Sequence, residues 1–328
     1  MQNCLNPDAL KETLNRRRVP CMVSFLHPFR IVEAQNSKPW RSSVQEVNSH
    51  SWDYVALHEM IGGLDVGLPA PYHMVVCRDG GVALPPIPDL RGEQEAVVFF
   101  NKCFASLLLG GVYCEAIGAD GIDFGSIIDW KYVRVHTSAL SAANRFHNLI
   151  RLKQSSAYEA IALEEPRILN FDELQQALSK GKLLLESVPE MGGEIFLRGV
   201  TGYARRDWGA ALANLWITIE QITSHIWKRD VIEPAKAEAI VSGRVDQLSD
   251  YRTWPISARH ELLLQIGSLR REAFSALSFA RKARNALSHE GRNPDDKAAS
   301  AALTSVRELL RPCLQSCGAQ TFSDGGYV

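Results

Sequence analysis

Three residues near the C-terminal end of the chain have side chains suited to phosphodiester chemistry. Arg284, Asn285 and His289 lie in the segment RKARNALSHEG at 281–291. Histidine titrates near neutrality, so His289 could accept a proton from an attacking hydroxyl or donate one to a departing oxygen. Arginine stays charged and presents a planar fork of donors, so Arg284 could hold a phosphate and stabilise its developing negative charge. This chemistry requires no metal ion.

The spacing of the three residues limits how one helix can present them. On a straight helix Arg284 and His289 project about 140° apart, because each residue turns the helix by about 100°. Asn285 and His289 are four residues apart and share a face, so Asn285 could orient the imidazole through a hydrogen bond. Arg284 must then reach around the helix, the helix must loosen before Gly291, or a dimer must assemble the site.

The motif and its setting resemble the signature of HEPN domains. The pattern R-N-x-x-x-H followed by a small residue stands at 284–289, late in a predicted helical bundle. Upstream, AALANLWITIEQITSHIW at 210–227 is similar to the Ala/Leu-rich helix with an embedded Trp and Glu of one HEPN branch. The resemblance covers roughly residues 200–318. It implies a metal-independent ribonuclease, a homodimer with two facing motifs, and a role in phage defence or as a toxin.

RNA cleavage through the ribose 2′-hydroxyl fits these residue types, since RNA carries this internal nucleophile and DNA does not. We therefore expect an endoribonuclease that uses Arg284, Asn285 and His289 and no cofactor. Each residue also has a structural interpretation: an arginine that covers the bundle, a polar surface asparagine, and a histidine that binds the last carbonyls of its helix. Because some HEPN proteins keep the bundle only for binding, the alternative function is a non-catalytic module that binds a nucleotide or a protein.

Two further groups of residues could assist the motif. Glu220 lies between Ile219 and Ile222, so it is either a carboxylate that flanks an apolar stripe or a polar member of the cleft. A set of basic residues could follow an RNA backbone or form a solvated helix face. It consists of Arg270, Arg271, Arg281 and Lys282.

The cysteines and histidines form no pattern typical of a metal site. Seven cysteines stand at 4, 21, 77, 103, 114, 313 and 317 without a CxxC pair, which predicts reduced thiols rather than disulfides or zinc ligands. Cys313 and Cys317 are four residues apart, but no histidine accompanies them, so we expect two small half-buried residues. A third possibility is an enzyme whose His and Asp side chains form a pocket within residues 1–199.

The composition is that of an ordinary globular protein. The 328 residues are 46% hydrophobic and 22% charged, and the net charge of −1 does not indicate a polyanionic partner for the chain as a whole. No apolar run is long enough to cross a bilayer, and the first twenty residues lack the apolar core of a secretory signal. We expect a cytoplasmic protein without a membrane partner.

The elements that must position the motif fall into two regions. Between about residues 20 and 137, short apolar runs alternate with turn residues, which predicts strands, with hairpin turns at RDGG (78–81) and GADG (118–121) and one helix within 91–111. After residue 138 helix formers dominate. The sequence therefore predicts an α+β domain over 1–199, followed by an all-α HEPN-type bundle over 200–328.

Three long helices are predicted in the bundle. Apolar residues recur at helical spacing from Trp208 to Ile226 and again from Leu262 to Ala280. A third helix is predicted from Asn293, which could cap it. PEMGGE at 189–194 predicts a linker through which the first domain could sense a trigger and restrain or direct the bundle.

Overall fold

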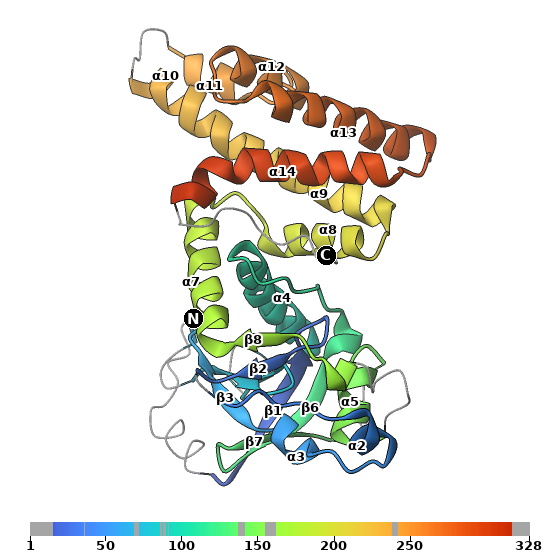
Figure 1. Ribbon diagram of the computed structural model, residues 1–328. Coiled ribbons are helices and arrows are strands. Elements are labelled where there is room, and N and C mark those ends of the chain that lie inside the picture. Colours follow the sequence, from blue (N-terminus) through green and yellow to red (C-terminus); the bar gives the residue numbers. More distant parts are fainter. Residues whose placement is uncertain are drawn as a thin grey trace. The chain divides into compact units, whose positions relative to one another are not determined.

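The computed structural model of the protein describes residues 16–35, 37–68, 72–85, 87, 90, 92–136, 142–154, 162–237 and 242–316 (Figure 1). The chain divides into two compact units, which we call the barrel unit (Met1–Cys103 with Ile117–Gln176) and the helical unit (Phe104–Ala116 with Ala177–Val328). Two helices contribute residues to both units, α4 (Glu93–Leu109) and α7 (Phe171–Ser187). A sheet-containing N-terminal region is thus followed by a helical C-terminal region, as the sequence predicts.

A six-stranded antiparallel sheet forms the centre of the barrel unit. Its strands are β1 (Arg18–Phe25), β3 (Met60–Leu64), β4 (Met74–Cys77), β5 (Gly81–Leu84), β6 (Asp123–Ile128) and β7 (Tyr132–Val135). They lie in the order β3-β4-β5-β1-β6-β7. At the ends of the two outer strands, a bridge pairs Glu59, the residue before β3, with Tyr132 of β7, and the Met60 N–H donates to the Lys131 carbonyl at 2.8 Å. The sheet therefore closes into a small barrel.

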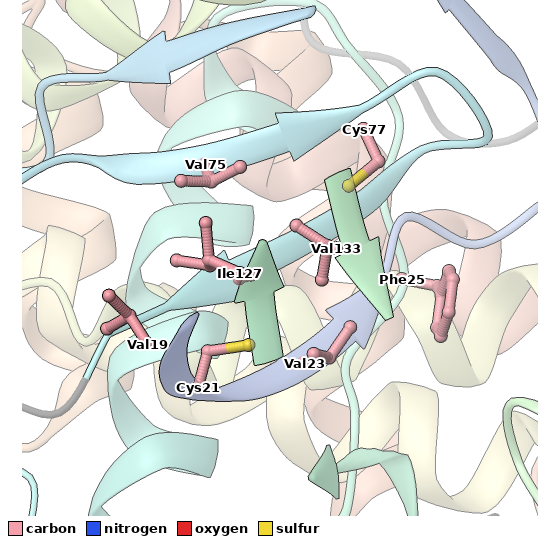
Figure 2. Close-up of a cluster of buried hydrophobic side chains, with 9 residues drawn as sticks. Val19, Cys21, Val23, Phe25, Val75, Cys77, Ile127 and Val133 are labelled. Carbon is pink, nitrogen blue, oxygen red and sulfur yellow. The ribbon is translucent and has the colours of Figure 1, made fainter. Parts of the chain in front are cut away.

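The interior of the barrel is filled by alternate residues of its strands, as the two-residue period of a strand requires. Figure 2 shows Cys21 and Val23 of β1 in one buried cluster with Ile127 of β6 and Val133 of β7. Burial raises the pKa of the Cys21 thiol to about 12, so this thiol stays protonated. Among the described residues every cysteine is free, in agreement with the predicted reduced state, while Cys4 and Cys317 lie outside them.

Smaller elements surround the barrel. The strands β2 (Ile31–Glu33) and β8 (Ile168–Asn170) pair in parallel. The short helices are α2 (Val44–Asn48), α3 (Tyr54–Leu57), the 3₁₀ helix η1 (Ala119–Gly121) and α5 (Arg145–Arg151). The indole of the buried Trp52 donates to the Ile150 carbonyl at 3.2 Å. Its ring belongs to a cluster of buried side chains from β2, α2, α3 and α5.

The helical unit consists of a stack of amphipathic helices and shorter connecting ones. They are α8 (Gly193–Ala204), α9 (Trp208–Trp227), the π-helical η3 (Lys228–Ile232), α10 (Glu233–Ala237), α11 (Arg244–Ser249), α12 (Ile256–Gln265), α13 (Arg271–Glu290) and α14 (Asp296–Ser316). The helix α9 packs against α8 and α14, and α13 packs against α14 (Figure 1). Buried Leu215, Ile219 and Ile222 confirm the predicted stripe of α9. None of the described helices is long and apolar enough to span a bilayer.

Several predicted elements are confirmed and others need correction. The helix predicted within 91–111 is α4, and RDGG is the turn between β4 and β5, with Gly80 at φ +77°. The hairpin predicted at 118–121 is wrong, because this segment forms η1 and leads into β6.

The apolar stripe from Leu262 to Ala280 belongs to two helices, not one. The helix α12 ends at Gln265, and α13 begins at Arg271. Gly267 between them has φ +80°, a conformation that favours glycine and ends the helix. The next helix is capped by Asp295 rather than Asn293, since the Ala298 N–H donates to the Asp295 carboxylate at 2.9 Å.

The observed division also differs from the expected boundary at residues 199 and 200, which falls inside α8. PEMGGE at 189–194 lies within the helical unit, so it does not link the two units. Gly193 begins α8 in close contact with its neighbours, where an added Cβ would lie 3.1 Å from the Ala105 Cβ and 3.3 Å from Leu185. Close packing, rather than a hinge, accounts for this glycine.

The free energy of unfolding of the helical unit is expected to depend on His260 of α12. Its imidazole is 3% exposed, and its Nε2 lies 3.0 Å from the Thr223 hydroxyl. Burial, and then the charge of Arg281, lower the pKa of His260 from 6.5 to about 4. The unfolded chain therefore binds more protons between these pH values, and unfolding becomes easier as the pH falls through them.

We expect the lowered pKa of His260 to cost about 2 kcal/mol of unfolding free energy between pH 7 and pH 5. Urea unfolding at both pH values measures this loss for the wild type and for His260→Gln, a variant that keeps a polar group facing Thr223. The variant should lose correspondingly less stability over this interval. Equal losses in the two proteins would contradict the assignment.

Candidate nucleic-acid site on helix α13

The helix α13 continues without a break through the motif. It runs to Glu290 and ends at Gly291, whose φ of +65° places it in the left-handed region used at helix C-termini. The Arg292 N–H closes this end by donating to the Ala286 carbonyl at 3.2 Å. The helix therefore does not loosen before Gly291, which removes one of the three ways of bringing Arg284 to His289.

The two central side chains of the motif leave α13 on different faces. Arg284 is half-buried, whereas His289 is exposed, as their separation of about 140° around the helix requires. The Arg284 guanidinium donates to the side-chain oxygen Oδ1 of Asn285 at 3.4 Å. Among the described contacts, Asn285 therefore meets Arg284 and not the imidazole that it was expected to orient.

His289 instead belongs to a polar face along the whole of α13. Residues separated by alternating steps of four and three lie on one side of a helix. We call these residues the α13 polar face: Arg271, Ser275, Ser278, Lys282, Asn285 and His289. The face contains no carboxylate, and all of its residues except half-buried Ser278 are exposed. It is thus a basic strip that ends at the imidazole.

A surface hollow of about 340 Å³ lies beside this face, at the turn between α13 and α14. Its lining includes the apolar Phe279, Ala283 and Ala286 and the charged Lys282, Arg292 and Asp295. The Phe279 ring is 49% exposed. The residue types and spacing of the motif do not predict this hollow, although the apolar residues at 279, 283 and 286 repeat at helical spacing outside the buried stripe.

The four basic residues expected to form a ridge do not share one surface. Arg271 and Lys282 lie on the α13 polar face. The charge of Arg281 acts on His260 of α12. Arg270 precedes α13 and lies 3.8 Å from the Glu308 carboxylate of α14. Only two of the four therefore remain candidates for binding a strand beside the motif.

Glu220 has a structural contact of its own. Its carboxylate accepts a hydrogen bond from the Trp216 indole one turn earlier on α9, at 2.6 Å. No described contact joins it to Arg284 or His289. This geometry fits the interpretation of Glu220 as a carboxylate flanking the apolar stripe.

His58 and His225, which lie outside the motif, each contact nearby protein groups. Within the described ranges no three His, Cys, Asp or Glu residues are arranged to hold a metal ion. The His225 Nδ1 donates to the Glu190 carboxylate at 2.7 Å. In the barrel unit, His58 contacts the carbonyls of Val133 and Arg151, so its ring serves the fold.

No family model, curated protein or solved structure matches the chain. The function must therefore be inferred from the side chains of α13 and their surroundings. The features that bear on it are an exposed imidazole, a guanidinium on another face of the same helix, a basic strip and an adjoining hollow.

Proposed function

We propose that the chain is a HEPN-type endoribonuclease of the cytoplasm that cleaves RNA through the ribose 2′-hydroxyl without a metal ion, in phage defence or a toxin-like role. The observation that supports this proposal most is the exposed His289 at the end of the carboxylate-free α13 polar face. A polyanion can lie along such a strip without meeting a like charge.

Each residue of the motif has a part in the proposed reaction. The His289 imidazole removes the 2′-hydroxyl proton or protonates the departing 5′-oxygen. The Arg284 guanidinium holds the scissile phosphate and stabilises the charge that builds up on it. Asn285, whose side-chain oxygen Oδ1 lies 3.4 Å from Arg284, positions the guanidinium rather than the imidazole.

Substrate binding is assigned to the surface around the motif. Lys282 and Arg271 contact backbone phosphates, and the hollow lined by Phe279 receives an unstacked base. Single-stranded RNA is recognised in this way, by aromatic stacking combined with basic contacts to the backbone.

A homodimer brings an Arg284 and a His289 together, which a single α13 helix does not do. Because α13 stays helical to Glu290, Arg284 and His289 of one copy point about 140° apart. Two copies related by a twofold axis can place His289 of one helix opposite the Arg284 of the other. The proposed site is therefore composite, with residues from both copies.

The alternative is a non-catalytic module of the same type that binds a nucleotide or a protein. The contact between Arg284 and Asn285 favours it, because it leaves His289 without a described hydrogen-bond partner to set its tautomer. A binding module would retain its ligand when His289 is replaced.

The barrel unit is proposed to recognise a trigger and to restrain or direct the helical unit. A shortened chain that begins at Val200 would not test this role, because it begins inside α8. It would also lack the parts of α4 and α7 that belong to the helical unit. Substitutions confined to the barrel unit are the suitable test.

We expect the purified protein to cleave total RNA and tRNA equally well with and without EDTA. A DNA strand of the same sequence should stay intact, because it lacks the 2′-hydroxyl. Gel analysis of end-labelled strands measures both results. Cleavage that disappears with EDTA, or that extends to DNA, would contradict the proposal.

A further inference from the structure

A second candidate site lies in the helical unit at the opposite end of α13 from the motif. It is a cavity of about 70 Å³ between the ends of α9 and α14 and the segment that precedes α13. We call it the arginine cavity. Its polar lining is formed by His225, Arg229, Ser268, Arg270, Glu308 and Arg311.

The lining carries more positive than negative charge. Three guanidiniums and one imidazole face a single carboxylate, that of Glu308. This carboxylate is shared, because it binds Arg311 and also lies 3.8 Å from Arg270. A carboxylate shared by two guanidiniums leaves one positive charge uncompensated.

The neighbouring carboxylates do not remove this excess. Asp230 is occupied by Arg229, at 2.6 Å. Glu190 lies 2.7 Å from His225 and 3.3 Å from Lys228. The three carboxylates of Glu190, Asp230 and Glu308 are therefore shared among four cations and one imidazole. Among these cations, Arg270 has the longest distance to its carboxylate, and its side chain is 60% exposed.

The cavity also lies beside the N-terminal end of α13. Leu269, Arg270 and Ala273 line it at the start of the 20-residue helix α13, and no side chain caps that start. Backbone N–H groups at such a terminus attract anions. The C-terminal ends of α9 and α14 also lie near the cavity and carry the opposite partial charge, so the anion site is assigned on the arginines and not on the dipole of α13.

Size limits the anion that fits. Sites for drug-sized ligands occupy roughly 300–1,000 Å³, whereas the arginine cavity has about 70 Å³. One tetrahedral oxyanion with its hydrogen-bonded arginines is the appropriate occupant, since guanidiniums bind phosphate oxygens in pairs.

We propose that the arginine cavity binds a single phosphate group, either inorganic phosphate or the terminal phosphate of a monoester. The site is separate from the motif and does not depend on the proposed ribonuclease activity. Arg270 and Arg311 supply the principal contacts, and Glu308 competes with the ligand for both guanidiniums.

The test is titration of the full-length protein with inorganic phosphate and, separately, with AMP, by calorimetry at constant ionic strength. Chloride at matched ionic strength is the reference. Arg270→Gln and Arg311→Gln should each weaken phosphate binding about tenfold, the range of one charged hydrogen bond. Arg198→Gln, which removes an exposed arginine of the same unit, should leave it unchanged.

A substitution of the cavity's carboxylate should change phosphate affinity in the opposite direction. Glu308→Gln should tighten phosphate binding, because it frees both guanidiniums. His289→Ala should bind phosphate like the wild type, which separates this site from the motif. Tighter binding of AMP than of phosphate would identify a monoester as the ligand. Phosphate binding no stronger than the chloride reference, or unaffected by the two arginine substitutions, would overturn the proposal.

Discussion

Replacing His289 with alanine should lower the rate of RNA cleavage at least about 100-fold, the usual contribution of a positioned general acid or base. His289 is exposed at the end of α13, so its removal should leave the fold intact. Arg284→Ala should cause a comparable loss by removing the charge that faces the phosphate. Rates are measured on a labelled single-stranded RNA, with circular dichroism and thermal unfolding as folding controls.

Ser288→Ala is the matched control, since Ser288 is exposed beside His289 but lies off the α13 polar face. It should cleave RNA at the wild-type rate. If His289→Ala also cleaves at that rate while remaining folded, the imidazole does not take part in the reaction and the binding-module alternative is favoured.

Mixing the two inactive variants tests the composite site. A heterodimer of Arg284→Ala and His289→Ala contains one site with an intact arginine from one copy and an intact histidine from the other. With random exchange, about one quarter of the wild-type rate should return, because half of the dimers carry one of two sites. No recovery after subunit exchange would mean that each site is built from a single copy.

Replacing Asp79 with asparagine should destabilise the barrel unit by about 3–5 kcal/mol, the cost of leaving one member of a buried ion pair without its partner. Asp79 is 0% exposed and Arg151 3%. The pair is bidentate, with Arg151 Nε 2.6 Å from Asp79 Oδ2 and Arg151 Nη2 2.7 Å from Asp79 Oδ1.

The cause is the charge that Arg151 retains. Burial alone would lower the pKa of its guanidinium, but the Asp79 carboxylate raises that pKa above its ordinary value. The cation lies over the Phe25 ring at 4.8 Å and donates to the Val133 carbonyl at 3.2 Å. Neither contact replaces the lost negative charge.

Urea unfolding, combined with hydrogen exchange of peptides from β1 and β6, measures the destabilisation and locates it. Glu59→Gln is the control, because it weakens an ion pair of the same unit whose carboxylate side chain is 38% exposed and whose arginine keeps a second partner, Glu33. This control should cost less than about 1 kcal/mol. Equal losses in the two variants would contradict the account of the buried pair.

Local periodicity predicted the elements whose burial pattern repeats along the chain. The apolar stripe of α9 gave its position to within a residue at each end. The same reasoning failed at Gly267, because the apolar residues of α12 and α13 keep helical spacing across the break. The strand β3, MIGGL, escaped prediction because its two glycines are typical of turns.

Long-range contacts could not be predicted from these patterns. Arg151 and Asp79 are 72 positions apart, and neither stands in a recognisable motif. Closure of the barrel depends on the bridge between Glu59 and Tyr132, which no local signal indicates.

The candidate site was predicted in part. The sequence placed Arg284, Asn285 and His289 at the end of a helix, and the structure places them on α13. It did not predict that Arg281 would act on His260 or that the turn after Gly291 would form a hollow over Phe279. Both depend on how α13 packs against neighbouring elements, which spacing along one helix does not reveal.

The most direct test of the proposed function is the identity of the RNA ends that cleavage leaves. If the 2′-oxygen attacks the phosphorus and the bond to the 5′-oxygen breaks, the 2′-hydroxyl proton is lost and the leaving oxygen gains one. Mass spectrometry of a short RNA cleaved in EDTA should then show a 2′,3′-cyclic phosphate on one fragment and a 5′-hydroxyl on the other. Fragments with a 5′-phosphate and a 3′-hydroxyl would show attack by water and would contradict the mechanism assigned to Arg284 and His289.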